Sequence, residues 1–232
     1  SWGIGLASCG FSCGDLLDRV LELMQRRAHH VDIGRSVDEG RAANGEAVGR
    51  IFASTAAAFN PVSPYATSKI AAEQLVRNQS KNHTIFRFFN VAGNNGEFGQ
   101  IGESTHLIRI AAETAAGKRT HMNINGTDWQ TRDGTCIRDY VHVMDLVECI
   151  IKAIETPANT DYECIGSGIG HTVNEVIDMM KEISGQDFNV IESPRRKGDT
   201  AEVLIPEHKS KYFYGNRTLE DMCLSAYKME LK

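Results

Sequence analysis

A tyrosine and a lysine stand four residues apart near the start of a helical pattern, in the segment NPVSPYATSKIAAEQL. Residues at this spacing lie on one face of a helix, so the phenol of Tyr65 and the ammonium of Lys69 are neighbours. A free phenol has a pKa near ~10, and a nearby cation favours the phenolate. The pair can therefore act as a base in hydride-transfer chemistry. Taken alone, the spacing also fits two solvated helix residues that fall together by chance.

The segment before this helix adds a hydroxyl group to the pair. Residues 51–59 read IFASTAAAF, a buried-strand pattern that ends in Ser54 and Thr55. A side chain at the carboxyl end of a parallel strand points into the crevice where α/β proteins bind ligands. Thr55 is therefore the third candidate for the chemistry.

Strands and helices alternate along the chain, which predicts an α/β protein with a mainly parallel sheet. A capping box formed by Thr172 and Glu175 predicts the start of one helix, and Thr218 with Asp221 predicts the start of the last one. The strand patterns cover residues 50–54, 84–91, 121–124, 162–166 and 188–193, and the helical patterns cover 15–27, 64–76, 106–117, 145–155, 173–184 and 219–226.

Composition limits the function classes. The chain has 232 residues, 41% hydrophobic and 24% charged, which is typical of a globular protein, and its net charge of −5 argues against a nucleic-acid partner. No apolar run approaches the length of a membrane span, and the N-terminal segment is a poor signal peptide, so we expect a cytoplasmic protein without a membrane partner. The six cysteines and eight histidines do not have metal-ligand spacing, so we expect no metal.

Four motifs occur in order: SPYATSK, FRFFNVAG, DGTCIRDYVHVMDLV and RRKGD. Together they resemble the UDP-glucose (UDP-galactose) 4-epimerases of the extended short-chain dehydrogenase/reductase superfamily. The resemblance covers roughly residues 51–205. It implies a Rossmann-like parallel sheet with a smaller C-terminal α/β substrate-binding domain, the cofactor NAD, a UDP-sugar substrate and a homodimer.

The resemblance also implies a reaction. Tyr65 is the base that takes the proton of the sugar 4-hydroxyl, Lys69 supports the phenolate and binds the nicotinamide ribose, and Thr55 binds the 4-hydroxyl. The C4 hydride moves to NAD and returns to the other face of a transient 4-keto sugar. Related sugar dehydratases have an acidic pair after the threonine, where this chain has Ala56 and Ala57. That favours epimerisation over elimination.

Substrate-binding residues follow from the same motifs. Asn90 is expected to contact the nucleotide-sugar, and Phe89 is expected near the nicotinamide. Guanidinium groups suit a diphosphate because they present forked, permanently charged donors. The full set implied for the UDP-sugar is Thr55, Tyr65, Asn90, His106, Leu107, Arg138, Arg196 and Asp199. Two alternatives stay open: a surface ion pair for Arg138 with Asp139, and a solvated basic turn for residues 195–197.

The N-terminal half departs from the family pattern. Gly10, Phe11 and Gly14 stand where a glycine-rich NAD loop belongs, with altered spacing, and Asp32 stands where the ribose-binding acid belongs. Eighteen residues, 33–50, separate Asp32 from the next strand, whereas a βαβ unit needs about 30 or more. We therefore expect an incomplete NAD-binding sheet, through real deletions or through segments missing from the sequence.

The expected domains are an NAD-binding part in residues 1–95 interleaved with 139–166, and a nucleotide-sugar-binding part in residues 96–138 and 167–232. Two further functions compete with epimerisation. One is a non-catalytic relic that binds a nucleotide-sugar, and the other is a dehydratase or decarboxylase of the same superfamily. The resemblance also implies that Val203 lies near the sugar 2-substituent, where a small side chain would leave room for N-acetylated hexoses.

Overall fold

The computed structural model describes residues 2–5, 49–80, 82–97, 104–156, 158–206 and 210–232. The helix expected at 15–27 and the glycine loop before it lie outside these residues. The chain divides into two compact units. Unit 1 contains residues 1–88, 147–165 and 208–214, and unit 2 contains residues 89–146, 166–207 and 215–232. No helix in the described part of the chain is long and apolar enough to cross a membrane.

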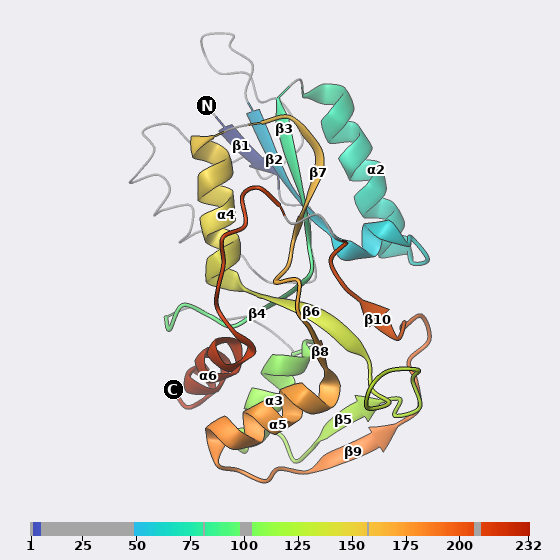
Figure 1. Ribbon diagram of the computed structural model, residues 1–232, viewed down its shortest axis with the longest axis vertical. Helices are drawn as coiled ribbons and strands as arrows, with labels where there is room; N and C mark the ends of the chain where they lie inside the picture. Colours follow the sequence, from blue (N-terminus) through green and yellow to red (C-terminus); the bar gives the residue numbers. More distant parts are fainter. Residues whose placement is uncertain (1, 6–48, 81, 98–103, 157, 207–209) are drawn as a thin grey trace. The chain divides into compact units, whose positions relative to one another are not determined.

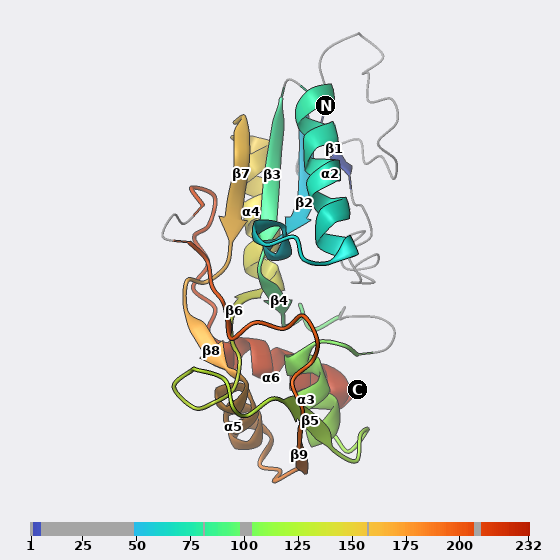
Figure 2. The same cartoon turned by 90° about the vertical axis from the view of Figure 1, so that its right-hand side faces the viewer.

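Unit 1 is built on a sheet of four parallel strands in the order β1 (Trp2–Gly5), β2 (Gly49–Thr55), β3 (His83–Phe88) and β7 (Thr160–Ile165). Helix α2 (Pro64–Gln79) lies along one face of this sheet, and the part of α4 (Val143–Glu155) that belongs to unit 1 lies along the other (Figures 1 and 2). The parallel pairing and the helices on both faces confirm the predicted Rossmann-like α/β class.

The start of α2 is fixed by local sequence. The Ser63 hydroxyl accepts a hydrogen bond from the Ala66 amide at 3.1 Å, and Pro64 occupies the first helical position, where its fixed φ is favourable. A short 3-10 helix, η1 (Ala56–Phe59), connects β2 to this start. The buried face of α2 packs its apolar residues against Phe52 and Ile85 of the sheet.

Unit 2 contains two small sheets. In the first, β4 (Asn90–Ala92), β6 (Ile137–His142) and β10 (Glu202–Val203) are parallel, and β8 (Gly170–Thr172) pairs antiparallel with β6. In the second, β5 (Met122–Asn125) pairs in parallel with β9 (Val190–Ser193). The strand predicted at 188–193 therefore begins two residues later than expected.

Three helices enclose the core of unit 2: α3 (Leu107–Ala115), α5 (Val173–Ser184) and α6 (Leu219–Glu230). Both predicted capping boxes are confirmed. The hydroxyls of Thr172 and Thr218 each accept a bond from the amide three residues on, and their own backbone amides donate to the carboxylates of Glu175 and Asp221. The core consists mainly of aliphatic residues from these helices and from β5, with Val176, Met180, Met222 and Cys223 among the most buried.

Candidate functional site

The tyrosine and lysine singled out by their spacing lie on the face of α2 next to β2. Tyr65 is in the first helical turn and is 37% exposed, whereas Lys69 is 2% exposed. The Lys69 ammonium lies 5.8 Å from the centre of the Tyr65 ring and donates a hydrogen bond of 3.1 Å to the Ala53 carbonyl of β2. The helix thus brings a buried cation beside a phenol that solvent can reach.

Thr55 ends β2, at the carboxyl edge of the parallel sheet of unit 1. Its hydroxyl oxygen accepts a bond of 3.3 Å from the Ala57 amide and so caps η1. Because the oxygen is the acceptor in this contact, the hydroxyl can still donate to a substrate oxygen. The three residues that follow are all alanine, so this turn has no side-chain acid or base.

A buried carboxylate one helical turn beyond Lys69 was missed by the sequence reasoning. Glu73 is 0% exposed and receives hydrogen bonds from Ser54 at 2.5 Å, from Arg87 at 2.9 and 2.8 Å, and from Arg77 at 3.1 Å. Burial raises the pKa of Glu73, but the bonds from Arg87 and Ser54 outweigh it and the pKa lies below its ordinary value of 4.5. The signal available in sequence was the continuation of the four-residue spacing from Lys69 to Glu73.

The lowered pKa of Glu73 predicts a pH-dependent contribution to stability. A carboxyl whose folded-state pKa is depressed stabilises the fold above its unfolded pKa, and this contribution is lost as the pH falls through the folded value. The gap in unfolding free energy between the parent and Glu73→Gln should be widest near neutral pH, should begin to narrow below about pH 4.5 and should close as the pH falls through the lower folded-state pKa. Urea unfolding followed by circular dichroism at several pH values measures the gap. A gap that is the same at every pH would contradict the prediction.

In unit 2, the segment that follows the RRKGD motif pairs with β6 at Arg138. Val203 of β10 pairs with Arg138 of β6, and the Arg138 guanidinium donates to the carbonyls of Ile137 at 2.8 Å and Ala201 at 3.4 Å. The Asp199 amide donates to the Arg196 carbonyl at 3.2 Å across a turn in which Gly198 has a φ of 92°. Glycine adopts this conformation without strain. Arg138, Arg196 and Asp199 therefore come from connected elements of one unit.

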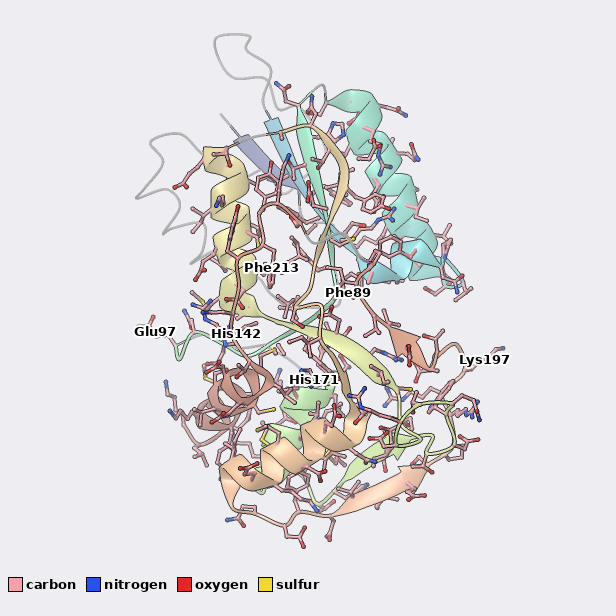
Figure 3. All side chains as sticks on the ribbon, viewed as in Figure 1. Phe89, Glu97, His142, His171, Lys197 and Phe213 are labelled. Atoms are coloured by element: carbon pink, nitrogen blue, oxygen red, sulfur yellow. The ribbon has the colours of Figure 1, made fainter. Side chains whose placement is uncertain are left out.

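Arg195 and Arg196 have different surroundings. The Arg195 side chain donates to the Asp128 carboxylate at 2.7 Å. Its guanidinium carbon also lies 4.1 Å from the centre of the Trp129 ring, on which it stacks. Gly126 makes room for this stack, because a β-carbon there would lie 2.6 Å from both Arg195 and Trp129. Arg195 therefore contacts the loop after β5, while residues 195–197 are all exposed, which agrees with the solvated-turn alternative. Lys197 projects from the outer side of the β9–β10 connection (Figure 3).

Asp139 is not in a surface ion pair, so that alternative is wrong. It is 0% exposed and accepts hydrogen bonds from the Ser167 amide at 2.7 Å, the Ser167 hydroxyl at 2.9 Å and the Gly168 amide at 2.9 Å. Gly166 is needed here, because a β-carbon would lie 2.8 Å from the Asp139 carboxylate. Burial raises the pKa of Asp139, and the bonds from Ser167 and Gly168 only partly offset it.

Asn90 and Phe89 stand at the start of unit 2. Asn90 of β4 lies opposite Tyr140 of β6 in the parallel register, and its side chain hydrogen-bonds the buried Tyr140 phenol. Burial raises the pKa of that phenol well above its ordinary value, so Tyr140 stays neutral. Phe89 is buried. The Asn90 amide is therefore held by a neutral partner.

His106 and Leu107 stand at the N-terminus of α3, with His106 as the N-cap residue. Burial and then the Arg109 cation lower the pKa of His106, so its ring is neutral at neutral pH. Arg109 in turn lies 3.1 Å from the Glu113 carboxylate on the same helix. A helix N-terminus offers free amides to an anion, which suits a phosphate. The remaining candidates, Gly10, Phe11, Gly14 and Asp32, lie outside the described residues.

A parallel α/β sheet with a hydroxyl residue at a strand end, followed by a helix with tyrosine and lysine four residues apart, defines the Rossmann-like short-chain dehydrogenase/reductase class. Residues 19–165 match the NAD dependent epimerase/dehydratase family. The chain belongs to this family.

Several known proteins similar to this chain are named UDP-sugar 4-epimerases. The UDP-glucose 4-epimerase of Rhizobium meliloti (strain 1021) is 34% identical over 166 residues, which are 67% of this chain and 50% of that enzyme. The UDP-Glc/GlcNAc 4-epimerase of Campylobacter jejuni is 34% identical, with a TM-score of 0.61 over 78% of this chain and 64% of its own. The chain thus spans about half the length of the curated relatives it matches.

The UDP-glucose 4-epimerase from Bifidobacterium longum, solved in complex with NAD+ and UDP, has a TM-score of 0.75 over 99% of this chain and 76% of its own. At 24% identity this likeness shows the fold alone. The relatives therefore establish the family and the Rossmann-like fold.

Proposed function

We propose that the protein epimerises a UDP-hexose at C4 in an NAD-dependent reaction, with Tyr65 as the base. The observation that carries the proposal is the contact between the buried Lys69 ammonium and the Tyr65 ring, with Lys69 also bonded to β2 two residues before Thr55, the last residue of that strand. This arrangement occurs in a chain that belongs to the epimerase/dehydratase family. Unit 1 is the NAD-binding part and unit 2 the nucleotide-sugar-binding part in this proposal.

The described residues fit the nicotinamide end of NAD by their chemistry. A phenol open to solvent, an ammonium that already bonds one carbonyl and a threonine hydroxyl at the strand end supply both donors and acceptors. Lys69 would hold the ribose hydroxyls, and Phe89 would pack near the ring. NAD, when bound, supplies the acceptor and donor of the C4 hydride.

The residues of this chain move the proton and hold the sugar. Thr55 orients the 4-hydroxyl, and the Tyr65 phenolate accepts its proton and later returns it. The Lys69 ammonium stabilises the phenolate, since a cation near a phenol favours the charged form. The all-alanine turn after Thr55 has no group that could remove a neighbouring hydroxyl, which favours epimerisation over elimination.

In this proposal, residues of unit 2 bind the UDP moiety. Arg138 and Arg196 bind the diphosphate, Asp199 binds the uridine ribose or orders the turn that contains Arg196, and Asn90 binds the nucleotide-sugar. His106 and Leu107 offer the N-terminal amides of α3 to the diphosphate. Val203 leaves space at the sugar 2-position, so UDP-N-acetylhexoses are accepted as well as UDP-glucose and UDP-galactose.

Substrate-dependent reduction of the cofactor tests the proposed function. Purified protein with NAD and UDP-galactose should yield UDP-glucose, and a near-ultraviolet band of reduced nicotinamide should appear on the protein during turnover. The matched control is the same protein with UDP, which fills the nucleotide site but has no sugar to oxidise. A protein that binds NAD and UDP but forms neither product nor band would be a binding relic, and the proposal would fail.

The proposed role of Val203 has its own test. Val203→Tyr should lower kcat/KM for UDP-N-acetylglucosamine by about 10-fold or more and leave that for UDP-glucose within about 3-fold, because a bulky ring fills the space of the N-acetyl group. Steady-state kinetics with both substrates measures the ratio. If the variant uses the N-acetylated sugar as well as the parent does, Val203 does not border the 2-substituent.

A further inference from the structure

Helix α2 has a stripe of functional groups with a period of four residues. Tyr65, Lys69, Glu73 and Arg77 follow one another at this spacing, so they line one face of the helix. Lys69 and Glu73 are 2% and 0% exposed. Charged side chains are seldom fully buried unless they are paired, so we expect the buried part of the stripe to make specific polar contacts between α2 and the sheet.

Glu73 is the centre of this contact. The Ser54 hydroxyl of β2 and the Arg87 guanidinium of β3 both bond its carboxylate, and these two residues lie opposite each other in the β2–β3 register. Arg87 forms two parallel bonds, of 2.9 and 2.8 Å, the bidentate geometry that fixes orientation as well as distance. One carboxylate therefore joins α2 to two adjacent strands.

The partner of Glu73 is itself held in place. The Arg87 guanidinium lies 4.7 Å from the centre of the Phe59 ring of η1 and 4.1 Å from that of Tyr162 of β7. The two rings meet edge to face at 5.5 Å. Arg77 bonds Glu73 at 3.1 Å and also donates to the Asp161 carbonyl of β7 at 2.8 Å. The network therefore extends over three strands of unit 1 and the turn that follows Thr55.

This network sets where α2 lies on β2. Lys69 donates a hydrogen bond to the Ala53 carbonyl, and Glu73 accepts one from the Ser54 hydroxyl. Successive turns of the helix are therefore bonded to successive residues of the strand. Two such hydrogen bonds, about 6 Å apart along the helix, fix both the rotation of the helix and its axial position. We propose that Glu73 is a positioning residue that holds α2 at the place where the Lys69 ammonium supports ionisation of Tyr65.

The inference rests on the proposed role of Tyr65 as the base, and it predicts an effect opposite to that of charge alone. Removing a negative charge near a phenol would ease its ionisation. Releasing the helix from β2 would instead free the Lys69 ammonium from its buried bond to the Ala53 carbonyl and let solvent screen its charge, which makes ionisation of Tyr65 harder. The direction of the change in Glu73→Gln therefore separates positioning from a through-space charge effect.

Spectrophotometric titration of Tyr65 tests the inference without cofactor or turnover. The phenolate absorbance of each chain, minus that of its Tyr65→Phe counterpart, isolates this one tyrosine. In Glu73→Gln, Tyr65 should ionise about one pH unit higher than in the parent. The matched control is Val76→Ala, which removes a buried contact from the same helix face but leaves the charged network intact. It should lower stability and leave the titration of Tyr65 within about 0.2 unit.

If Tyr65 ionises at the same or a lower pH in Glu73→Gln, or if Val76→Ala shifts it equally, the inference is wrong. Should Glu73→Gln not fold, Ser54→Ala deletes one bond and keeps both arginine pairs. It should shift Tyr65 in the same direction by about 0.3 unit or more, and no shift would overturn the inference. A chain that shows these shifts but fails to epimerise would refute the proposed function and leave the positioning role in place.

Discussion

Replacing Tyr65 with phenylalanine is expected to lower the rate of C4 epimerisation by about 1,000-fold while UDP binding stays within about 3-fold of the parent. A positioned general base typically contributes about 10²- to 10⁴-fold, and the phenol oxygen is the only atom that this substitution removes. Because Tyr65 is 37% exposed at the end of a helix, its hydroxyl is not needed to fill the core. Epimerisation assays and UDP titration calorimetry on the same preparation measure the two quantities.

Tyr214→Phe is the matched control for this experiment. Tyr214 also belongs to unit 1 and is 69% exposed, and the substitution removes the same atom. It should change neither the rate nor the affinity. A Tyr65→Phe chain that retains at least a third of the parental rate would rule out Tyr65 as the base, and loss of UDP binding would point to misfolding rather than lost chemistry.

Replacing Arg196 with methionine is expected to weaken UDP binding by about 30-fold. A charge-assisted hydrogen bond contributes about 1.5–3 kcal/mol, and each 1.4 kcal/mol is about tenfold in affinity. The neighbouring Arg195 is engaged by Asp128 and Trp129, so it is not expected to replace the lost guanidinium. Calorimetric titration with UDP measures the loss, and UMP should show a smaller one because it has no second phosphate.

Lys197→Met is the control for Arg196→Met, because it removes the same charge from the next residue of an exposed turn. The two substitutions change the long-range electrostatic potential by nearly the same amount, so a general electrostatic effect would weaken UDP binding in both variants. Direct contact with the diphosphate predicts a loss of no more than about 3-fold for Lys197→Met. Equal losses in the two variants would contradict a specific role for Arg196.

Local sequence was sufficient to predict those features of the fold that depend on a few adjacent residues. The capping boxes at Thr172 and Thr218 have the predicted geometry, and the α/β class followed from the alternation of strand and helix patterns. The predicted first and last residues of the helices and strands were less accurate. Helix α4 begins at Val143, two residues before the predicted start, because the chain turns from β6 directly into the helix.

The sequence could not reveal contacts between distant segments. Glu73 and Arg87 are 14 residues apart, and Arg77 bonds a carbonyl 84 residues away. The clue was an arginine within the otherwise apolar run IFRFF, since a buried arginine requires a partner. Likewise, Arg195 meets Asp128 across 67 residues, and only the pairing of β5 with β9 brings them together. The roles of the site residues remain predictions that the variants above test.

In the proposed reaction, the protein removes a hydride from C4 of a UDP-hexose and returns it to the opposite face. UDP-galactose labelled with deuterium at C4 tests this directly, by nuclear magnetic resonance of the products formed in ordinary water. Return of the same hydride to the opposite face predicts UDP-glucose that retains the deuterium at C4. Product with hydrogen from water at C4, a dehydrated sugar, or no conversion in the presence of NAD would contradict it.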